Sequence, residues 1–304
     1  MIRRRRQAPT LIPYPGRVRR RSRPQAYRRI WRLPLLLAYL VLAFPLAWWT
    51  YARKTEPDNQ GFAAFRWWSR RVLGIFGIRL RVEGEIPTAP VLVAANHVSY
   101  LDILALASVA PGQFVAKREM RSWPFFGFMG EWLGTFFIDR QDARASQRVL
   151  KEATKVLERG RIVLIFPEGT TSDGKIVREF YGAPFETAAA AGVPTVPVAL
   201  RYEDTLRPGQ PDRLCPFVGD DSLLRHLWRL AAAAPLTLRL TFCPPLAADL
   251  GRRQLASKTH AAISEALRRM EQGASVTYLS SSRGLSRRHP LRDAWNSWRR
   301  GHGA

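Results

Sequence analysis

The feature that most restricts the fold of this chain is a regular alternation of two segment types that begins near residue 78. Runs that are apolar, or that alternate apolar with polar residues, predict strands at 78–82, 91–96, 113–117, 135–138, 161–166, 195–200 and 236–242. Segments typical of helices separate them, at 101–109, 143–158, 183–191, 223–234 and 253–271. Such alternation is typical of α/β proteins. We therefore expect a three-layer α/β/α domain over residues 79–272, with a mixed, largely parallel sheet.

The charge of the chain is strongly positive and unevenly distributed. Lys and Arg number 48 against 24 Asp and Glu, a formal net charge of +24, and residues 1–32 contain twelve arginines and no acidic residue. An anionic partner is expected, either a nucleic acid, a membrane surface or an acidic substrate or carrier protein. We predict that residues 1–32 and the basic segment 273–304 are disordered tails. The two cysteines exclude a disulfide-rich scaffold and a zinc cluster built on cysteine.

An uncharged apolar segment follows the first basic stretch. Residues 33–51 contain no charged side chain, and a helix of that length reaches about 28 Å, close to the thickness of the hydrocarbon core of a bilayer. Tryptophan and tyrosine flank it, as is typical of the membrane interface. We predict a transmembrane or re-entrant helix beside a polybasic tail that contacts anionic lipid. The alternatives are a secretory signal, which the long basic run disfavours, and nucleic-acid binding by residues 1–32.

A second segment with affinity for membranes is predicted at residues 61–78. Aromatic and aliphatic residues recur there at helical spacing, with Arg66, Arg70 and Arg71 among them. This pattern favours an interfacial helix, and with the preceding segment it predicts a membrane-associated helical hairpin over residues 33–78. An ordinary surface helix is the alternative.

One of the five histidines lies in surroundings that indicate chemistry. His97 directly follows the apolar run 91–96 and precedes Asp102, at the expected start of the next helix, by five positions. The end of a strand and the start of a helix can bring two such side chains together. A carboxylate on one imidazole nitrogen leaves the other nitrogen free to accept a proton from a substrate hydroxyl, so no reactive serine is required. The alternative is a structural histidine that caps a helix.

A second candidate site follows the run 161–166. The sequence FPEGTTSDG at 166–174 forms a turn that can present backbone N–H groups and the hydroxyls of Thr170, Thr171 and Ser172 to an anion. Glu168 beside it can orient a cation or a substrate hydroxyl. Arg140, just past the run 135–138, is a candidate for binding phosphate or carboxylate. The alternatives are ordinary turn chemistry and a solvated arginine.

Taken together, these segments resemble the glycerolipid acyltransferase family, which includes the 1-acylglycerol-3-phosphate and other lysophospholipid acyltransferases. The resemblance covers residues 75–205 and rests on four blocks in the family's order. These are Asn96, His97 and Asp102; Gly134 and Arg140; Phe166, Pro167, Glu168, Gly169 and Thr170; and Val193, Pro194, Val196 and Pro197. The first and third blocks occurring together are highly specific.

The resemblance implies a role for each block. His97 would be the general base, Asp102 its orienting partner, and Arg140 with residues 168–172 would hold the acceptor. The donor would be a fatty acyl thioester of coenzyme A or acyl carrier protein, and no metal or redox cofactor would be required. The membrane-associated segments would place the catalytic domain at the cytoplasmic face of the inner membrane. Nucleic acid is not expected as a partner.

The resemblance leaves the acceptor open between two lysolipids. Conversion of 1-acyl-sn-glycerol-3-phosphate to phosphatidate in phospholipid biosynthesis is the first expectation. However, many phosphatidate-forming members have Arg where this chain has Thr171, and Lys where it has Tyr181. Lys175 or Arg178 are the possible replacements. Without such cations the sequence resembles the branch that acylates lyso-ornithine lipid at least as well.

Two functions other than acyl transfer are also compatible with parts of the sequence. A membrane-tethered basic binding protein would explain the charge, but binding does not require a His–Asp pair beside FPEGT. Thioester hydrolysis would use water in place of the acceptor hydroxyl, and thiol release without a lysolipid would indicate it.

Overall fold

The computed structural model describes residues 26–52, 59–88, 90–139, 141–204, 211–219 and 221–272. Its centre is a seven-stranded sheet in the order β1-β7-β6-β2-β5-β3-β4, in which β6 and β7 are antiparallel and all other neighbours parallel. The strands are β1 (Ile78–Glu83), β2 (Leu92–Ala95), β3 (Gln113–Lys117), β4 (Phe136–Ile138), β5 (Val163–Ile165), β6 (Thr195–Asp204) and β7 (Leu236–Phe242).

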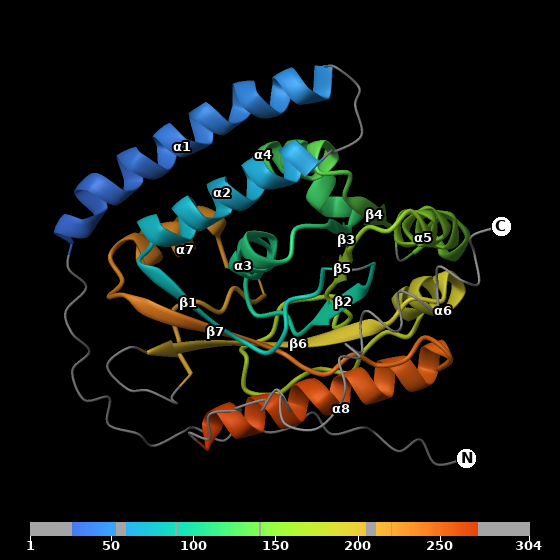
Figure 1. The fold of residues 1–304 in the computed structure, drawn as a ribbon. Coiled ribbons are helices and arrows are strands. Elements are labelled where there is room, and N and C mark those ends of the chain that lie inside the picture. The colour runs from blue at the N-terminus through green and yellow to red at the C-terminus, as the bar shows by residue number, and fades with distance from the viewer. Residues whose placement is uncertain are drawn as a thin grey trace, which may run out of the picture.

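Helices cover both faces of this sheet (Figure 1). On one face lie α2 (Asn59–Ile75), α3 (Leu101–Val109), α4 (Pro124–Trp132) and α7 (Leu223–Ala231), with α1 (Tyr27–Ala52) outside α2. On the other lie α5 (Ala143–Glu158), α6 (Glu186–Ala191) and α8 (Arg252–Glu271). Two short 3₁₀ helices, η1 (Arg118–Ser122) and η2 (Ala183–Phe185), precede α4 and α6. The α/β class and the largely parallel sheet are confirmed.

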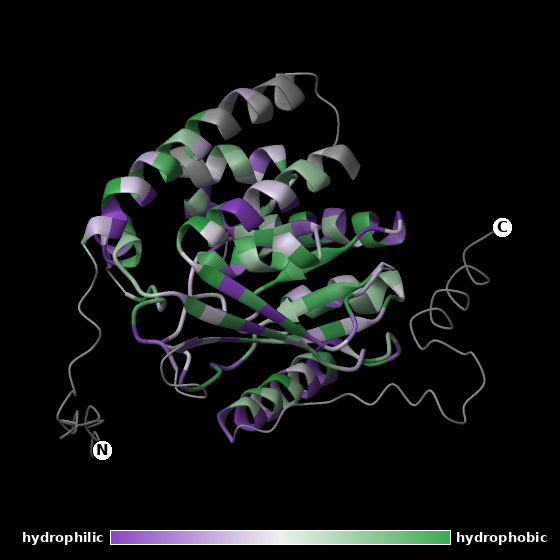
Figure 2. Ribbon diagram, turned by 60° about the vertical axis from the view of Figure 1, so that its left-hand side comes forward, coloured by the Kyte–Doolittle hydropathy of each residue, from purple (hydrophilic) through white to green (hydrophobic). Residues whose placement is uncertain are grey.

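The buried side chains form separate apolar clusters on the two faces. The larger cluster joins α2 and α3 to the sheet, and two smaller ones join α5, α6 and α8 to its other face. Figure 2 shows hydrophobic residues concentrated on the strands, while α8 carries both hydrophobic and hydrophilic positions. The fully buried strands β2 and β5 therefore lie between two apolar layers, as their uninterrupted apolar sequences require.

A proline inside a strand, such as Pro197, is typical of an edge strand or a bulge. β6 is not an edge strand, because it pairs with β2 on one side and β7 on the other. Pro197 lies before the regular β6–β7 ladder, which starts at Val198 opposite Phe242. The next bridge joins Thr195 to Leu246, so the chain after β7 has one residue more than β6 over this interval. This irregularity in register accommodates a proline, which has no N–H to donate, inside the sheet.

The N-terminal helix begins earlier than the sequence suggested. We placed Arg28, Arg29 and Arg32 in a disordered tail, but α1 starts at Tyr27. The guanidinium of Arg32 is buried and donates to the carbonyl oxygens of Ala231 and Ala233 at the end of α7. Arg28 donates to the same Ala233 oxygen at 2.7 Å. These arginines satisfy carbonyls that a helix C-terminus leaves free, and this fixes the start of α1. Residues 1–25 and 273–304, for which we expected disorder, lie outside the described residues.

The apolar residues of the second segment face protein. Phe65, Val72 and Ile75 of α2, which we expected at a lipid interface, are buried in the larger cluster. Arg66 and Arg70 donate to the carbonyl oxygen of Ser108 at the end of α3. The alternative of an ordinary helix that packs on the domain therefore fits α2 better. Within the part of the chain that the structure describes, no helix, α1 included, is long and apolar enough to cross a bilayer.

Candidate active site

The sheet order brings the two candidate blocks together. β2 and β5 are parallel neighbours, so the segments that follow them leave the sheet at the same edge. His97 lies two residues past the end of β2, and Phe166 lies directly after β5. Their rings stack with centroids 3.9 Å apart and planes inclined by 16°. Two blocks separated by some 70 residues of sequence thus lie side by side at this edge of the sheet.

His97 and Asp102 form the expected pair. The Nδ1 atom of His97 lies 2.9 Å from Oδ2 of Asp102, whose side chain is fully buried, while the imidazole is 15% exposed. An ionised carboxylate accepts only, so Nδ1 carries the proton and Nε2 is left as the acceptor. The imidazole therefore has the tautomer that general-base chemistry requires.

The start of α3 holds Asp102 in place. Its Oδ2 also accepts from the backbone N–H groups of Val98 at 2.6 Å and Ser99 at 2.9 Å. Asp102 is the second residue of α3, so its carboxylate accepts from backbone N–H groups that directly precede the first turn of the helix. The second carboxylate oxygen, Oδ1, accepts from the hydroxyl of Tyr202 on β6 at 2.6 Å. Both oxygens of Asp102 are therefore engaged by groups inside the protein.

Asn96 joins the strand that carries His97 to its neighbour. Its amide donates to the carbonyl oxygen of Leu200 on β6 and accepts from the N–H of the same residue, at 3.0 and 2.7 Å. The side chain thus continues the β2–β6 pairing one residue beyond the end of β2. Asn96 has a structural role here, since it fixes the direction in which His97 leaves the sheet.

A tight turn follows β5. The N–H of Gly169 donates to the carbonyl oxygen of Phe166, with Pro167 and Glu168 between them. Pro167 provides the backbone angle that the second position of such a turn prefers. Gly169 has a φ of +69°, which favours glycine. The turn directs the Phe166 ring toward His97 and buries the side chain of Glu168.

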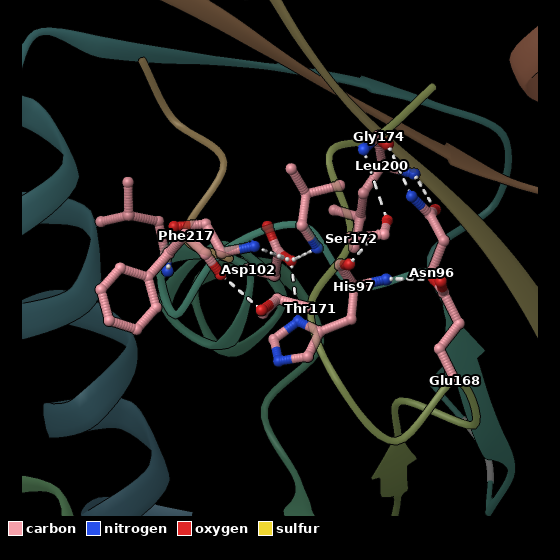
Figure 3. A network of polar contacts seen from close by, with 12 residues as sticks. Asn96, His97, Asp102, Glu168, Thr171, Ser172, Gly174, Leu200 and Phe217 are labelled. Carbon is pink, nitrogen blue, oxygen red and sulfur yellow. Dashed lines mark hydrogen bonds and ion pairs between the residues drawn. The ribbon is translucent and has the colours of Figure 1, made fainter. Parts of the chain in front are cut away.

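Glu168 contacts backbone rather than open space. Its Oε1 accepts from the N–H of His97 at 2.7 Å (Figure 3). Its Oε2 accepts from the N–H of Arg178 at 3.0 Å. Burial raises the pKa of Glu168 above its ordinary value, and these two N–H groups partly offset that effect. The Glu168 carboxylate thus holds the backbone of His97 in place.

The hydroxyl residues of the same block also bind the surrounding backbone. The N–H and Oγ of Ser172 both donate to the carbonyl oxygen of His97, at 2.8 and 3.2 Å. The hydroxyl of Thr171 donates to the carbonyl oxygen of Phe217, whose own N–H donates to Val98. Figure 3 shows the polar contacts of this region as one network around His97. Of the three hydroxyl residues at 170–172, Thr170 is the exposed one.

The other predicted site residues have different positions. Gly134 lies in the turn before β4 with a φ of +64°, and its carbonyl oxygen accepts from the side-chain amide of Gln113. Pro197 lies within β6, opposite Ala94 of β2. Both have structural roles that glycine and proline suit. Arg140 lies outside the described residues, so its role in binding the acceptor stays a prediction.

Two residues that contact the site were absent from the sequence predictions. Tyr202 lies beyond the predicted end of its strand, and Phe217 lies in a segment for which we expected no element. The signal for Tyr202 was the period-two pattern of Val198, Leu200 and Tyr202, which places all three on the face that carries α3. No comparable pattern points to Phe217.

Comparison with known proteins identifies the family to which this chain belongs. Residues 78–201, which contain the His97–Asp102 pair and the turn after β5, match the family model described as Acyltransferase. The lyso-ornithine lipid O-acyltransferase of Pseudomonas aeruginosa is 38% identical over 245 residues, which cover 79% of this chain and 93% of that protein. The chain belongs to the acyltransferase family. It is thus an acyltransferase enzyme. The blocks around His97 and Phe166 lie together at the edge of the sheet described above.

Two further acyltransferases show how far the similarity extends. The 1-acyl-sn-glycerol-3-phosphate acyltransferase of Neisseria meningitidis serogroup B is 41% identical over 180 residues, which cover 57% of this chain and 68% of that protein. The crystal structure of the 1-acyl-sn-glycerophosphate (LPA) acyltransferase PlsC from Thermotoga maritima aligns with a TM-score of 0.58 and 19% identity. That alignment covers 81% of this chain and 96% of PlsC, so the acyltransferase fold extends through most of the chain.

Proposed function

We propose that this acyltransferase moves a fatty acyl group from a thioester of coenzyme A or acyl carrier protein to the free hydroxyl of a lysolipid. The observation that carries the proposal is the His97–Asp102 pair, with Nδ1 hydrogen-bonded to the carboxylate and Nε2 left as the acceptor. The names of the related enzymes, which act on lysolipids, support the choice of acceptor class.

The reaction follows from the geometry of His97. Nε2 takes the proton of the acceptor hydroxyl, and the oxygen attacks the thioester carbonyl carbon. The tetrahedral intermediate then expels the thiolate as the carbon–sulfur bond breaks, and the imidazolium returns its proton to sulfur. The products are an ester and a free thiol, and no step requires a metal or redox cofactor.

Thiol release tests this mechanism directly. With acyl thioester and lysolipid, the wild-type protein is expected to release thiol at a rate that depends on the acceptor. His97→Ala removes the base and is expected to abolish this release. Turnover of His97→Ala at the wild-type rate would reject the mechanism, and thiol release without any lysolipid would indicate hydrolysis instead.

For the acceptor, we favour lyso-ornithine lipid over 1-acyl-sn-glycerol-3-phosphate. The Pseudomonas relative that matches over 93% of its length acts on lyso-ornithine lipid. The residue after Thr170 is Thr171, which has no guanidinium to bind phosphate, and its hydroxyl donates to the carbonyl oxygen of Phe217. Lys175, one possible replacement cation, is paired with Asp173 at 2.6 Å. The Neisseria relative supports the glycerophosphate as the second candidate.

Substitution at Thr171 separates these two acceptors. Thr171→Arg is expected to raise kcat/KM for the glycerophosphate relative to lyso-ornithine lipid by about tenfold, since a guanidinium can pair with phosphate. Thr171→Val is the matched control, because it removes the same hydroxyl without adding charge. A wild-type enzyme that prefers the glycerophosphate would overturn the assignment to lyso-ornithine lipid and leave acyl transfer intact.

The same proposal places the enzyme on an anionic membrane surface, at the cytoplasmic face of the inner membrane. Ile30, Leu37 and Val41 on the outer side of α1 are exposed, the last two at 61% each. Leu224 and Trp228 of the neighbouring α7 are exposed too, and Arg29 of α1 lies over the Trp228 ring. Exposed apolar side chains beside arginines suit the boundary between headgroups and acyl chains.

Vesicle flotation tests this surface. The double substitution Leu37→Asp and Val41→Asp is expected to reduce binding to vesicles that contain anionic phospholipid, with little effect on stability because both side chains are exposed. Ser257→Asp with Ala261→Asp on the exposed side of α8 adds the same charge on the other face of the domain and is the control. Equal loss of binding in both variants would show that net charge determines the binding and that the apolar side of α1 does not.

A further inference from the structure

Among the described residues, Tyr202 is the only one outside residues 97–99 whose side chain or backbone donates a hydrogen bond to the carboxylate of Asp102. Tyr202 lies on β6, one hundred residues after Asp102, with 3% of its surface exposed. Its Oη donates to Oδ1 of Asp102 at 2.6 Å, a short distance typical of a hydroxyl that binds a carboxylate. Burial, followed by the nearby charge of Asp102, raises the pKa of Tyr202, so the phenol stays a donor.

The contacts of Asp102 are divided between its two oxygens. Oδ2 accepts from the imidazole of His97 and from the backbone N–H groups of Val98 and Ser99. Oδ1 accepts from Tyr202. The backbone donors and His97 all belong to residues 97–99, so they move together with the loop. Tyr202 instead ties the carboxylate to the central sheet.

The orientation of the carboxylate plane depends on this division. Rotation about the bond from Cβ to the carboxyl carbon moves both oxygens of Asp102. The three donors at Oδ2 and the Tyr202 hydroxyl at Oδ1 therefore oppose this rotation together, and Tyr202 is the donor that acts from the central sheet to keep Oδ2 directed at Nδ1 of His97. The backbone of β6 near this point is itself fixed, because Leu200 exchanges two hydrogen bonds with Asn96.

We propose that Tyr202 is a positioning residue of this acyltransferase, which orients Asp102 and, through it, the proton-accepting imidazole of His97. The inference rests on the proposed function, because it assigns Tyr202 a part in the same proton transfer. Tyr202 touches neither the substrate nor the reacting atoms in this role. The loss of its hydroxyl leaves the acceptor's binding surface unchanged and disturbs the base.

Tyr202→Phe tests this role, with Thr187→Val as the matched control. Thr187 at the start of α6 is also buried, and its hydroxyl donates to the carbonyl oxygen of Pro184 at 2.7 Å. Both variants remove one buried hydroxyl, so both are expected to lower the unfolding temperature. Tyr202→Phe alone is expected to lower kcat by about tenfold to a hundredfold, the loss of one hydrogen bond to a charged group, with KM for the lysolipid changed less than about twofold.

A spectroscopic readout separates positioning from stability. The Nδ1 proton of His97, hydrogen-bonded to Asp102, is expected to give a low-field proton resonance that shifts or broadens in Tyr202→Phe and stays in place in Thr187→Val. Wild-type kcat and an unshifted resonance in Tyr202→Phe would overturn the proposal. Activity in His97→Ala would instead overturn the proposed mechanism, so the two failures are distinguishable.

Discussion

At the scale of the residue, the proposed mechanism depends on the charge of Asp102, which stabilises His97 when the imidazole accepts a proton. Asp102→Asn keeps the shape of the side chain, but its amide can no longer accept from all the donors that surround the carboxylate. The amide then favours the wrong imidazole tautomer. We expect kcat for thiol release to fall about a thousandfold or more, with the fold retained in circular dichroism. A loss below tenfold would show that His97 does not depend on this partner.

A second prediction at this scale concerns Glu168 and pH. Because burial raises its pKa above the ordinary value of 4.5, the folded state binds the proton more tightly than the unfolded state. The stability that Glu168 contributes is therefore greatest below pH 4.5 and falls as the pH rises through the folded pKa. Glu168→Gln does not titrate, so the unfolding free energy of wild type minus that of the variant is expected to decrease over this window.

Glu265 provides the control for that titration. Hydrogen bonds from Arg269 and Arg268 lower its pKa, so the sign is reversed and its contribution is lost as the pH falls. Chemical denaturation of wild type, Glu168→Gln and Glu265→Gln at a series of pH values measures both effects. A difference for Glu168→Gln that rises with pH would contradict the prediction.

At the scale of the element, α1 depends on arginines that bind the end of α7. Arg32→Met keeps the apolar stem but removes the guanidinium that donates to the carbonyl oxygens of Ala231 and Ala233, and only Ala233 keeps a second donor, Arg28. We expect a loss of about 2–3 kcal/mol in unfolding free energy and faster hydrogen exchange in α1 and the end of α7. Arg71→Met is the control, since Arg71 is exposed and lies over the Trp67 ring. Equal exchange in the two variants would exclude this contact as the anchor of α1.

Elements were predictable from sequence where local signals determine them. The bounds of α5 were predicted because the Asp142 side chain caps its first turn and Gly160 follows its end with a φ of +82°. β6 was predicted to end at residue 200, but it continues to Asp204. In this extension, the buried carboxylate of Glu203 forms an ion pair with Arg239 of β7. A partner that distant in sequence gives no local signal.

The candidate site likewise contains some contacts that the sequence predicts and others that it does not. The meeting of His97 with the turn after β5 was predictable, because both follow strands of a parallel sheet. The contact of Thr171 with Phe217 depends on how the segment 211–219 returns to the site, which no periodic pattern encodes. The contact of Tyr202 with Asp102 was missed because it lies on the unpredicted part of β6.

At the scale of the whole molecule, the net charge of +24 and the exposed apolar side of α1 both suit the anionic membrane surface that we propose as a partner. Residues 1–25 contain nine arginines and no acidic residue, so deleting them removes nine positive charges and leaves α1 in place. Since each cation near an anionic bilayer contributes about 1 kcal/mol, we expect affinity for anionic vesicles to fall at least about tenfold. The binding that remains is expected to depend less steeply on salt.

Activity separates this membrane effect from catalysis. The His97 site is built from residues 96–102, 166–178 and 202, so the deleted protein is expected to retain wild-type kcat with a lysolipid dispersed in detergent. On anionic vesicles its rate is expected to fall in proportion to the bound fraction. Deleting residues 1–51 is a harsher change, because it also removes Arg32 and uncovers Trp68, which donates to the Tyr39 carbonyl. Loss of kcat in detergent after deletion of residues 1–25 would mean that the basic segment takes part in the reaction as well as in binding to the membrane.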